Sequence, residues 1–400
     1  MLRRLTAPYC FAPEALVHVE FRHAFSRCAA MLLATVWLGA LAGCPGEPPS
    51  RQDGGAGGGT RTPKARNGGE RAPARIEELT RSRPLMGTIM RVTVIDAPRD
   101  RAEQAVAEAL DEMERLERVL SEWLPESEIS RINAAAGKHP VKVGRDTLAV
   151  VSAALDVARW SEGAFDPTWA AMRGLYDFRP GRFHVPRTAE IRRRVRLVDW
   201  RQVEIDEAAS TVFLRRPGMA LGTGGIAKGY ALDRAAAVLR RAGVRSYMLY
   251  GGGQVQVGGL KHGRPWRVGI QHPRRARDFF GFFAVQDVSI STSGDYERYE
   301  IDARGRRWHH ILDPRKGMPA RGAISVTVLA PTGLYADALS TAAFVLGPKR
   351  ALRMFETMPY EADFVMVDAR CRIVATEGGR KRLKLRPEAV EGEQLRGCTP

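Results

Sequence analysis

Cysteine is scarce in this 400-residue chain: it has five cysteines, and none belongs to a Cys/His cluster with zinc-site spacing. No GxSxG nucleophile elbow and no internal repeat is present. The glycine-rich stretch 221–235 matches neither GxGxxG nor GxxxxGK[ST], so no common nucleotide-binding motif can be assigned. With 44% apolar residues, the chain can form one large or two medium domains whose cores need no disulfide.

Long apolar runs are also missing. In residues 22–44, basic residues precede an apolar segment that is too short to span a bilayer as an anchor. We interpret residues 1–44 as a signal peptide whose end, LAGC, resembles a bacterial lipobox. Cys44 is then expected to become the lipidated first residue of an extracytoplasmic, membrane-anchored lipoprotein on the periplasmic side. The alternative is a buried apolar helix with a chance cysteine.

An extracytoplasmic compartment is oxidising, so Cys371 and Cys398 either form a disulfide or remain as two surface thiols. The formal net charge is +17, which suits anionic partners such as nucleotides or phospholipid head groups. The arginines are scattered and no DNA- or RNA-binding module is recognisable, so we expect no nucleic-acid partner. We favour an arginine-rich proteome as the explanation of the charge.

Residues 45–78 are rich in glycine, proline and arginine, with almost nothing apolar to bury, which predicts a disordered tether before a folded domain at 79–400. Strands and helices mix in that domain without regular alternation, so an α+β fold fits better than a doubly wound α/β fold. Apolar periodicity predicts a strand over 85–96, helices over 106–120, 148–158, 230–239, 335–346 and 348–357, a polar loop over 121–133, and short strands from 246 to 328.

Two of the motifs with potential chemistry are each ambiguous alone. In HHILDPRKG (309–317), a histidine before an Asp-Pro turn is either a general base or a structural histidine. In ADALSTAAF (336–344), Asp337 and Thr341 are four residues apart, so on a helix their oxygens point to one side. Such oxygens suit Mg2+, although an aspartate at a helix start also satisfies free N–H groups.

Three further stretches are equally open. GAFDPT (163–168) and TSGDYERY (292–299) fit plain turn chemistry, because Asp and Gly are favoured at turns for backbone reasons. LGTGGIAKGYALDRA (221–235) is either a phosphate cradle at a helix N-terminus or a tight turn between a strand and a helix.

The order of these motifs is more specific than any one of them. MGT, SEWLPESEISRIN, GAFDPT, GGIAKGYALD, GGG, TSGDYER, HILDPRKG and ADALSTA together resemble the successive motifs of the ApbE family, the FAD:protein FMN transferases, over residues 85–347. The resemblance implies a single mixed α/β domain of the ApbE-like, T-fold-related type. It also implies binding of FAD and Mg2+ and transfer of FMN to a threonine hydroxyl of a respiratory or redox-type target protein, with release of AMP.

The resemblance assigns roles to residues of this chain by motif. Met86 and Trp123 would flank the flavin or adenine rings, and Ala164, Phe165 and Asp166 would line the FAD site. Lys228 would meet phosphate or another polar part of FAD, with Ile311 nearby, while the Gly225 carbonyl, Asp337 and Thr341 would hold Mg2+ and Ser340 would be its neighbour. His310 is the expected base for the threonine proton, and Asp313 would turn the loop or orient that histidine.

One position departs from the family pattern. The pattern reads Asp-Leu-Gly-Gly-Ile-Ala-Lys-Gly, and this chain has Gly222 where the aspartate, an expected FAD contact, would stand. The loss would weaken FAD binding, change its geometry, or be offset by Thr223 or by another carboxylate that the sequence does not locate. Two alternatives to transfer therefore stay open: Mg2+-dependent hydrolysis of FAD to FMN and AMP, and a non-catalytic FAD-binding lipoprotein.

Overall fold

The computed structural model describes residues 75–179 and 181–399. Cys44, the expected signal peptide and residues 45–74 of the expected tether lie outside the described residues. Regular structure begins at Arg75, in strand β1 (Arg75–Leu85), four residues before the predicted start of the domain at Leu79. The predicted boundary is wrong because Ile76, which was assigned to the tether, pairs with Ala97 of the next strand and is buried. Among the described residues, no helix has the length and apolar character needed to cross a membrane.

An antiparallel sheet of eight strands forms the centre of the fold, and its strand order is β1-β2-β6-β7-β10-β15-β16-β17. Along β2 the side chains of Met90, Val92 and Val94 are buried, as the predicted alternation requires. Beyond β1, the strands of this sheet are β2 (Thr88–Pro98), β6 (Tyr247–Gly251), β7 (Gln254–Gly258), β10 (Val288–Gly294), β15 (Ala323–Ala330), β16 (Asp363–Asp368) and β17 (Ile373–Ala375).

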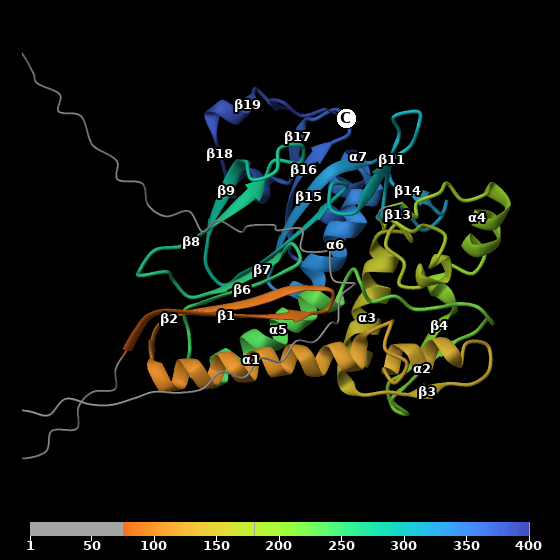
Figure 1. The fold of residues 1–400 in the computed structure, drawn as a ribbon, viewed down its shortest axis with the longest axis horizontal. Coiled ribbons are helices and arrows are strands. Elements are labelled where there is room, and N and C mark those ends of the chain that lie inside the picture. Colours follow the sequence, from red (N-terminus) through yellow and green to blue (C-terminus); the bar gives the residue numbers. More distant parts are fainter. Residues whose placement is uncertain (1–74, 180, 400) are drawn as a thin grey trace, which may run out of the picture. The chain divides into compact units, whose positions relative to one another are not determined.

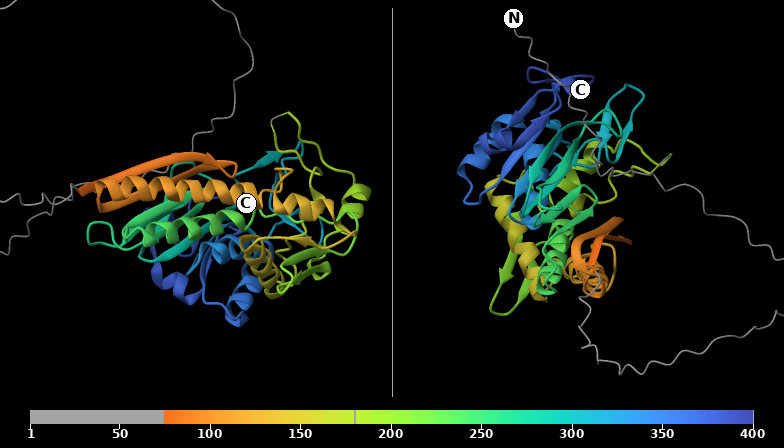
Figure 2. Two further views of the ribbon diagram at one scale, coloured as in Figure 1. Left: turned by 90° about the horizontal axis from the view of Figure 1, so that it is seen from below. Right: turned by 90° about the vertical axis from the view of Figure 1, so that its left-hand side faces the viewer.

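Helices cover one face of this sheet. In Figure 1, α1 and α5 run along one side of β1, β2, β6 and β7, and Figure 2 shows α1 lying along β1. α6 packs on α5, β10 and β15, so it lies at the middle of the covered face. The helices of this layer are α1 (Arg99–Leu120), α3 (Arg145–Trp160), α5 (Ala227–Arg241), α6 (Gly333–Leu346) and α7 (Pro348–Thr357). These helices and the α+β class confirm the sequence prediction.

The opposite face of the large sheet is covered by a three-stranded sheet of order β18-β9-β8, with Phe280 and Phe283 buried in the core between them. The bounds of its strands are β8 (Trp266–Gln271), β9 (Phe279–Val285) and β18 (Leu383–Leu385). Smaller elements complete the described fold: β3 (Val141–Lys142), β4 (Val203–Asp206), β5 (Thr211–Leu214), β11 (Tyr299–Ile301), β12 (Arg307–His309), β13 (Leu312–Asp313), β14 (Met318–Pro319), β19 (Val390–Glu391), β20 (Gln394–Leu395), α4 (Thr188–Val195) and α8 (Glu377–Arg382).

The segment 121–133, predicted to be a polar loop, contains helix α2 (Glu128–Ala134). Ser127 is its N-cap, and its side chain accepts the N–H of Ser130 at 3.0 Å. Ile129 and Ile132, three residues apart, are both buried. The loop prediction was wrong because two isoleucines at helical spacing and a serine cap outweigh the polarity of the segment.

The two central helices α5 and α6 cross in close backbone contact. A Cβ added to Gly229 of α5 would lie 1.9 Å from the carbonyl oxygen of Gly333 in α6. Asp233, one turn further along α5, accepts the N–H groups of Gly333 and Leu334 at 2.7 and 2.8 Å. This side chain satisfies free donors at the start of α6 and fixes that helix against α5.

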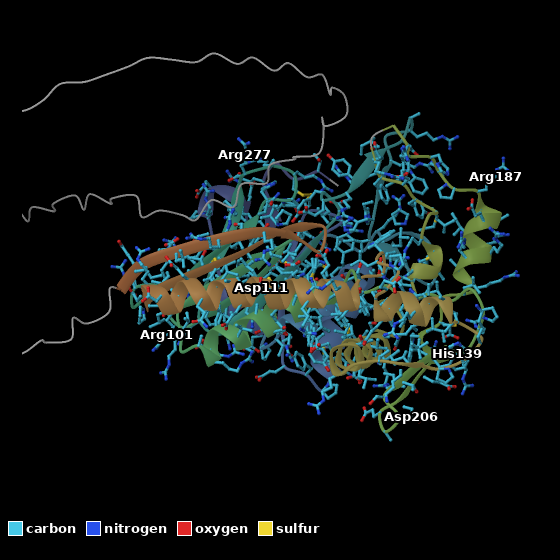
Figure 3. All side chains as sticks on the ribbon, turned by 60° about the horizontal axis from the view of Figure 1, so that its bottom comes forward. Arg101, Asp111, His139, Arg187, Asp206 and Arg277 are labelled. Atoms are coloured by element: carbon cyan, nitrogen blue, oxygen red, sulfur yellow. A yellow bond between two sulfur atoms is a disulfide. The ribbon has the colours of Figure 1, made fainter. Side chains whose placement is uncertain are left out.

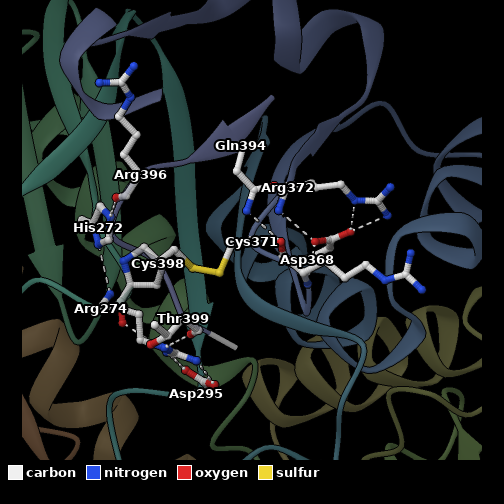
Figure 4. The surroundings of a disulfide bond; sticks show 12 residues. His272, Arg274, Asp295, Asp368, Cys371, Arg372, Gln394, Arg396, Cys398 and Thr399 are labelled. Atoms are coloured by element: carbon white, nitrogen blue, oxygen red, sulfur yellow. Dashed lines mark hydrogen bonds and ion pairs between the residues drawn. A yellow bond between two sulfur atoms is a disulfide. The ribbon is translucent and has the colours of Figure 1, made fainter. Parts of the chain in front are cut away.

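Of the two alternatives for the C-terminal cysteines, the disulfide is confirmed. Cys371 and Cys398 are bonded, with their Cα atoms 5.8 Å apart. Figure 4 shows the surrounding contacts that hold the C-terminal segment. His272 bonds the Arg396 carbonyl at 2.9 Å, and Arg274 donates to the Thr399 carbonyl at 2.8 Å. The same Arg274 forms a two-pronged, buried ion pair with Asp295 of the TSGDYER motif, so this aspartate is structural.

Replacing Cys398 with serine is expected to lower the free energy of unfolding by about 3–4 kcal/mol, because the bond closes a long loop in the unfolded chain. Its two cysteines are 27 residues apart in sequence. Urea denaturation of oxidised wild type, reduced wild type and the variant measures the effect. If all three share one midpoint, the bond does not contribute to stability.

Basic side chains are spread over several elements. Figure 3 labels Arg101 on α1, Arg187 before α4 and Arg277 before β9, and the three lie in separate parts of the described surface. The distribution agrees with the scattered arginines of the sequence.

Candidate functional site

Helix α6 carries the predicted metal ligands into the interior of the fold. Asp337 and Thr341 lie one turn apart on this helix, and Asp337 is only 3% exposed. Its Oδ2 accepts the Gly229 N–H at 3.1 Å, and its Oδ1 accepts Nε2 of Gln254 at 2.7 Å. Burial raises the pKa of Asp337, and the nearby charge of Lys228 acts in the opposite direction. This carboxylate therefore needs positive charge close by to remain ionised.

Lys228 supplies part of that charge from the start of α5. Its Nζ lies 3.9 Å from Oδ2 of Asp337 and donates a 2.6 Å hydrogen bond to the Gly224 carbonyl. The next residue of the loop, Gly225, faces the same space: a Cβ built on it would lie 3.3 Å from Phe165 and 3.6 Å from Oγ1 of Thr341. The structure thus brings Gly225, Lys228, Asp337 and Thr341 together from two separate motifs, with Phe165 of a third motif beside Gly225.

The donors at this place fit Mg2+. A carboxylate, a threonine hydroxyl and the backbone of a glycine loop offer the hard oxygens that Mg2+ prefers. The side-chain oxygen Oε1 of Gln254, whose amide nitrogen bonds Asp337, is buried and has no hydrogen-bond partner among the described residues. This unpaired acceptor is available to a cation or to its water. No group of three or more His, Cys, Asp or Glu side chains suited to a metal occurs in the described part of the chain.

Ser340 belongs to a hydroxyl network behind these donors. Its Oγ donates to the Asp337 carbonyl at 2.8 Å and lies 3.1 Å and 2.8 Å from the hydroxyls of Ser291 and Ser293 on β10. Ser293 also contacts Oγ1 of Thr341 at 3.2 Å. Ser340 therefore ties α6 to β10, and Thr341 is the hydroxyl that faces Gly225.

The two adjacent histidines of HHILDPRKG have different environments. His309 is buried against Phe344 and bonds the Ala320 carbonyl through Nε2 at 2.8 Å. His310 is exposed at the surface, and its Nδ1 lies 3.3 Å from the Arg298 carbonyl. Although solvent reaches this residue, the protein atoms packed around its ring, together with the positive charges of Arg298 and Lys228, lower the pKa of His310. A neutral ring that donates from Nδ1 presents Nε2 as a proton acceptor.

Asp313 turns the loop and does not contact His310 in any described bond. Its carboxylate accepts the backbone N–H and Nε of Arg315 at 3.1 and 2.7 Å, and Nη2 at 3.0 Å. Of its two predicted roles, the structure supports turning the loop.

Met86 occupies the two-residue turn between β1 and β2. Both Met86 and Gly87 have positive φ values, 52° and 70°, as in the turns that match strand twist. The carboxylate of Glu117 on α1 accepts the Met86 N–H at 2.7 Å and holds the turn against the end of that helix. Met86 is half-buried, so part of its side chain remains available to a ligand.

Trp123 follows the C-terminus of α1 and is 69% exposed, which is rare for a ring of this size and leaves it free to stack on a flat ligand. The Arg173 guanidinium lies 4.4 Å from the centroid of this ring.

The GAFD segment is mostly interior. Ala164, Phe165 and Ile311 are buried in the main core, and the Phe165 ring lies against Gly225. Asp166 accepts the N–H and hydroxyl of Thr168 at 2.8 and 2.6 Å through Oδ1 and the Trp200 N–H at 3.0 Å through Oδ2. These bonds correspond to the turn-chemistry interpretation of this motif.

Four further residues shape the site without having been singled out in the sequence. Their contacts are made across long sequence separations, so local pattern carries no signal for them. The nearest signal in the sequence was the position of Glu122, directly before the exposed Trp123. The four are Glu117, Glu122, Arg173 and Gln254.

Comparison with known proteins identifies the fold and the family. A family model described as the ApbE family matches residues 86–366. A protein named FAD:protein FMN transferase from Treponema pallidum (strain Nichols) is 34% identical over 320 residues, which cover 76% of this chain and 88% of that protein. A protein of the same name from Klebsiella pneumoniae (strain 342) is 34% identical over 292 residues, covering 72% of this chain and 88% of that protein.

Similar folds also occur among solved structures. The flavin transferase ApbE from Vibrio cholerae superposes with a TM-score of 0.68 at 27% identity and covers 76% of this chain and 99% of that one. The ApbE protein from Thermotoga maritima gives a TM-score of 0.65 at 32% identity, covering 78% of this chain and 97% of that one. The matched model spans more than half of the residues and the relatives match over most of their length, so this chain belongs to the ApbE family.

Proposed function

We propose that this chain is an Mg2+-dependent transferase that moves the FMN half of FAD onto a threonine hydroxyl of a target protein and releases AMP. Relatives that it matches over most of their length are named FAD:protein FMN transferase. The observation that carries the proposal is the convergence of Gly225, Lys228, Asp337 and Thr341, because a buried carboxylate beside a lysine and oxygen donors suits a metal with a phosphate ligand.

The bonds formed and broken in the transfer, and the proton released, can each be assigned to an atom. The hydroxyl oxygen of the acceptor forms a bond to the FMN phosphorus, the bond from that phosphorus to the bridging oxygen breaks, and AMP leaves with that oxygen. The hydroxyl proton goes to Nε2 of His310, which is neutral because its pKa is lowered.

Mg2+, when bound, neutralises charge on the phosphate oxygens. In the chain itself, Asp337 and Thr341 would hold it together with the Gly225 carbonyl, and Lys228 adds a fixed positive charge beside them. Trp123, after the C-terminus of α1, and Met86, whose N–H is bonded by Glu117 of α1, provide an exposed ring and a thioether for the flat rings of FAD.

One assay separates transfer from its two alternatives. The purified chain is incubated with FAD, Mg2+ and a protein fragment that bears an acceptor threonine, and the products are analysed by mass spectrometry. Fragment carrying FMN, together with free AMP, supports the transferase. Free FMN and AMP with unmodified fragment indicate hydrolysis, and bound but intact FAD indicates a non-catalytic binder. A chain that does not bind FAD contradicts all three.

The chain acts outside the cytoplasm, anchored by a lipid on Cys44, and its targets are redox proteins of the respiratory type. The lipobox-like residues before Cys44 support the anchor, and the Cys371–Cys398 disulfide supports an oxidising compartment.

Replacing Cys44 with alanine is expected to move most of the protein from the membrane fraction to the soluble fraction, because the thiol that carries the lipid is gone. Fractionation and fatty-acid labelling measure the change, with Cys398→Ser as the matched cysteine variant. An unlabelled wild-type chain would contradict the anchor.

A further inference from the structure

Position 222, where the family pattern has an aspartate, has no room for any side chain. A Cβ built on Gly222 would lie 2.6 Å from Nε1 of Trp169 and 2.7 Å from Oε2 of Glu122. Gly222 is not among the glycines with positive φ, so its backbone conformation does not require glycine. Close neighbours, and not backbone strain, therefore fix glycine at this position.

One of those neighbours is itself a carboxylate. Glu122 follows the C-terminus of α1 and is 7% exposed. Its Oε2 accepts the Thr223 N–H at 2.7 Å, and the carboxylate also interacts with the Gly224 N–H. The Cβ of an aspartate at position 222 would clash with this oxygen, at 2.7 Å. Burial raises the pKa of Glu122, and Arg173 and the two N–H groups act in the opposite direction. Glu122 thus brings a carboxyl group to the loop 222–225 from a point 100 residues earlier in the chain.

Glu122 also connects this loop to the exposed ring. Its Oε1 lies 3.3 Å from Nη2 of Arg173, whose Nη1 donates to the Glu122 carbonyl at 3.0 Å. Arg173 in turn covers the ring of Trp123 at 4.4 Å. Nε of Arg173 is buried and has no hydrogen-bond partner among the described residues, which leaves a donor for a ligand.

We propose that Glu122 supplies the carboxylate that this chain lacks at position 222, and that it positions the Gly225 loop, Arg173 and Trp123 relative to one another for FAD. The inference rests on the proposed function. The proposal predicts that positions 122 and 222 depend on each other. Glycine is required at 222 because glutamate occupies 122, so a change at either position alone weakens FAD binding. Glu122 acts as a positioning residue, since its bonds go to protein groups.

The first test measures FAD affinity in the full chain by flavin fluorescence. Glu122→Gln keeps the shape and removes the ionisable group, and it is expected to raise the Kd for FAD about tenfold, since half-buried Arg173 loses its carboxylate partner. Glu126→Gln, an exposed glutamate four residues away, is the matched control and should bind as wild type. Equal affinity of Glu122→Gln and wild type, at equal melting temperature, overturns the proposal.

The second test compares the effect of one substitution on FAD affinity in two backgrounds, where opposite effects are expected. Gly222→Asp in the wild type meets Trp169 and Glu122 and is expected to weaken FAD binding at least tenfold. The same substitution in a Glu122→Ala, Trp169→Ala background has space and restores a carboxylate, so it is expected to strengthen binding relative to that background. Weakening of similar size in both backgrounds contradicts the dependence between the two positions.

A third measurement needs no FAD. Hydrogen exchange of the Thr223 amide, which Glu122 bonds, is expected to accelerate in Glu122→Ala and to stay unchanged in Glu126→Ala. Unchanged exchange at Thr223 contradicts the positioning role. If wild type fails to bind FAD while the exchange effect is present, the proposed function fails and the anchoring of the loop by Glu122 stands.

Discussion

Replacing Asp337 with asparagine is expected to reduce Mg2+-dependent FMN transfer about a thousandfold, while the chain stays folded. Asparagine has nearly the shape of aspartate, and its single oxygen can still accept the Gly229 N–H. Its NH2 group can donate to Oε1 of Gln254 if that amide turns over, but asparagine lacks the charge that a divalent cation needs. Because burial raises the pKa of Asp337, the neutral side chain should not lower stability.

The matched control for this variant is Asp233→Asn. Asp233 is also a buried aspartate in the α5–α6 pair, and burial raises its pKa to about 6, but its partners are the N–H groups at the start of α6 and the Gln256 side chain. Transfer rates are measured against Mg2+ concentration, with circular dichroism as a check on folding. The ligand assignment is wrong if Asp337→Asn transfers at the wild-type rate while EDTA inhibits the wild type.

Replacing His310 with alanine is expected to lower kcat by about a hundredfold to ten-thousandfold, with little change in the Kd for FAD. The reason is that Nε2 of His310 is the proposed acceptor of the threonine proton, and Nδ1 is directed at the Arg298 carbonyl. His139, an exposed histidine that bonds the neighbouring Pro140 carbonyl, provides the control substitution to alanine. Wild-type rates for His310→Ala from pH 6 to 9 would remove His310 from the mechanism.

The pH profile of the wild type tests the same assignment. A base must be unprotonated, so kcat/KM falls as pH drops through its pKa. The protein atoms packed around its ring and the neighbouring cations lower the pKa of His310. The acid limb is therefore expected below the usual histidine value of about 6.5, and the rate should be level through neutral pH. An acid limb above that value would contradict a lowered pKa.

Several features of the fold follow from local sequence alone. The five long helices and β2 are where apolar spacing predicts them, because one face of each element must be buried. The loop prediction for 121–133 failed where two isoleucines and a capping serine within a polar segment determined a short helix. The tether prediction extended too far at 75–78, since Ile76 is buried only by pairing with β2.

The candidate site also combines features that follow from sequence spacing with features that only the structure shows. Asp337 and Thr341 share one side of a helix, which the spacing of four residues requires. Their meeting with Gly225 and Lys228 was expected only from resemblance to a family, and the structure shows the distances. Asp166 has the right place in the order of motifs, yet its oxygens are bonded by Thr168 and Trp200, a use that no spacing predicts.

By itself, the sequence determined the α+β class, the helices and the ordered motifs, because these depend on residues close together in the chain. The sequence also identified Gly222 as the position that departs from the family pattern. Only the tertiary structure shows why a side chain does not fit there, by placing Glu122 and Trp169 in the space that it would occupy. The physical reason is that a carboxylate acts through its position in space, and residues 100 positions apart are brought together by packing and not by local pattern.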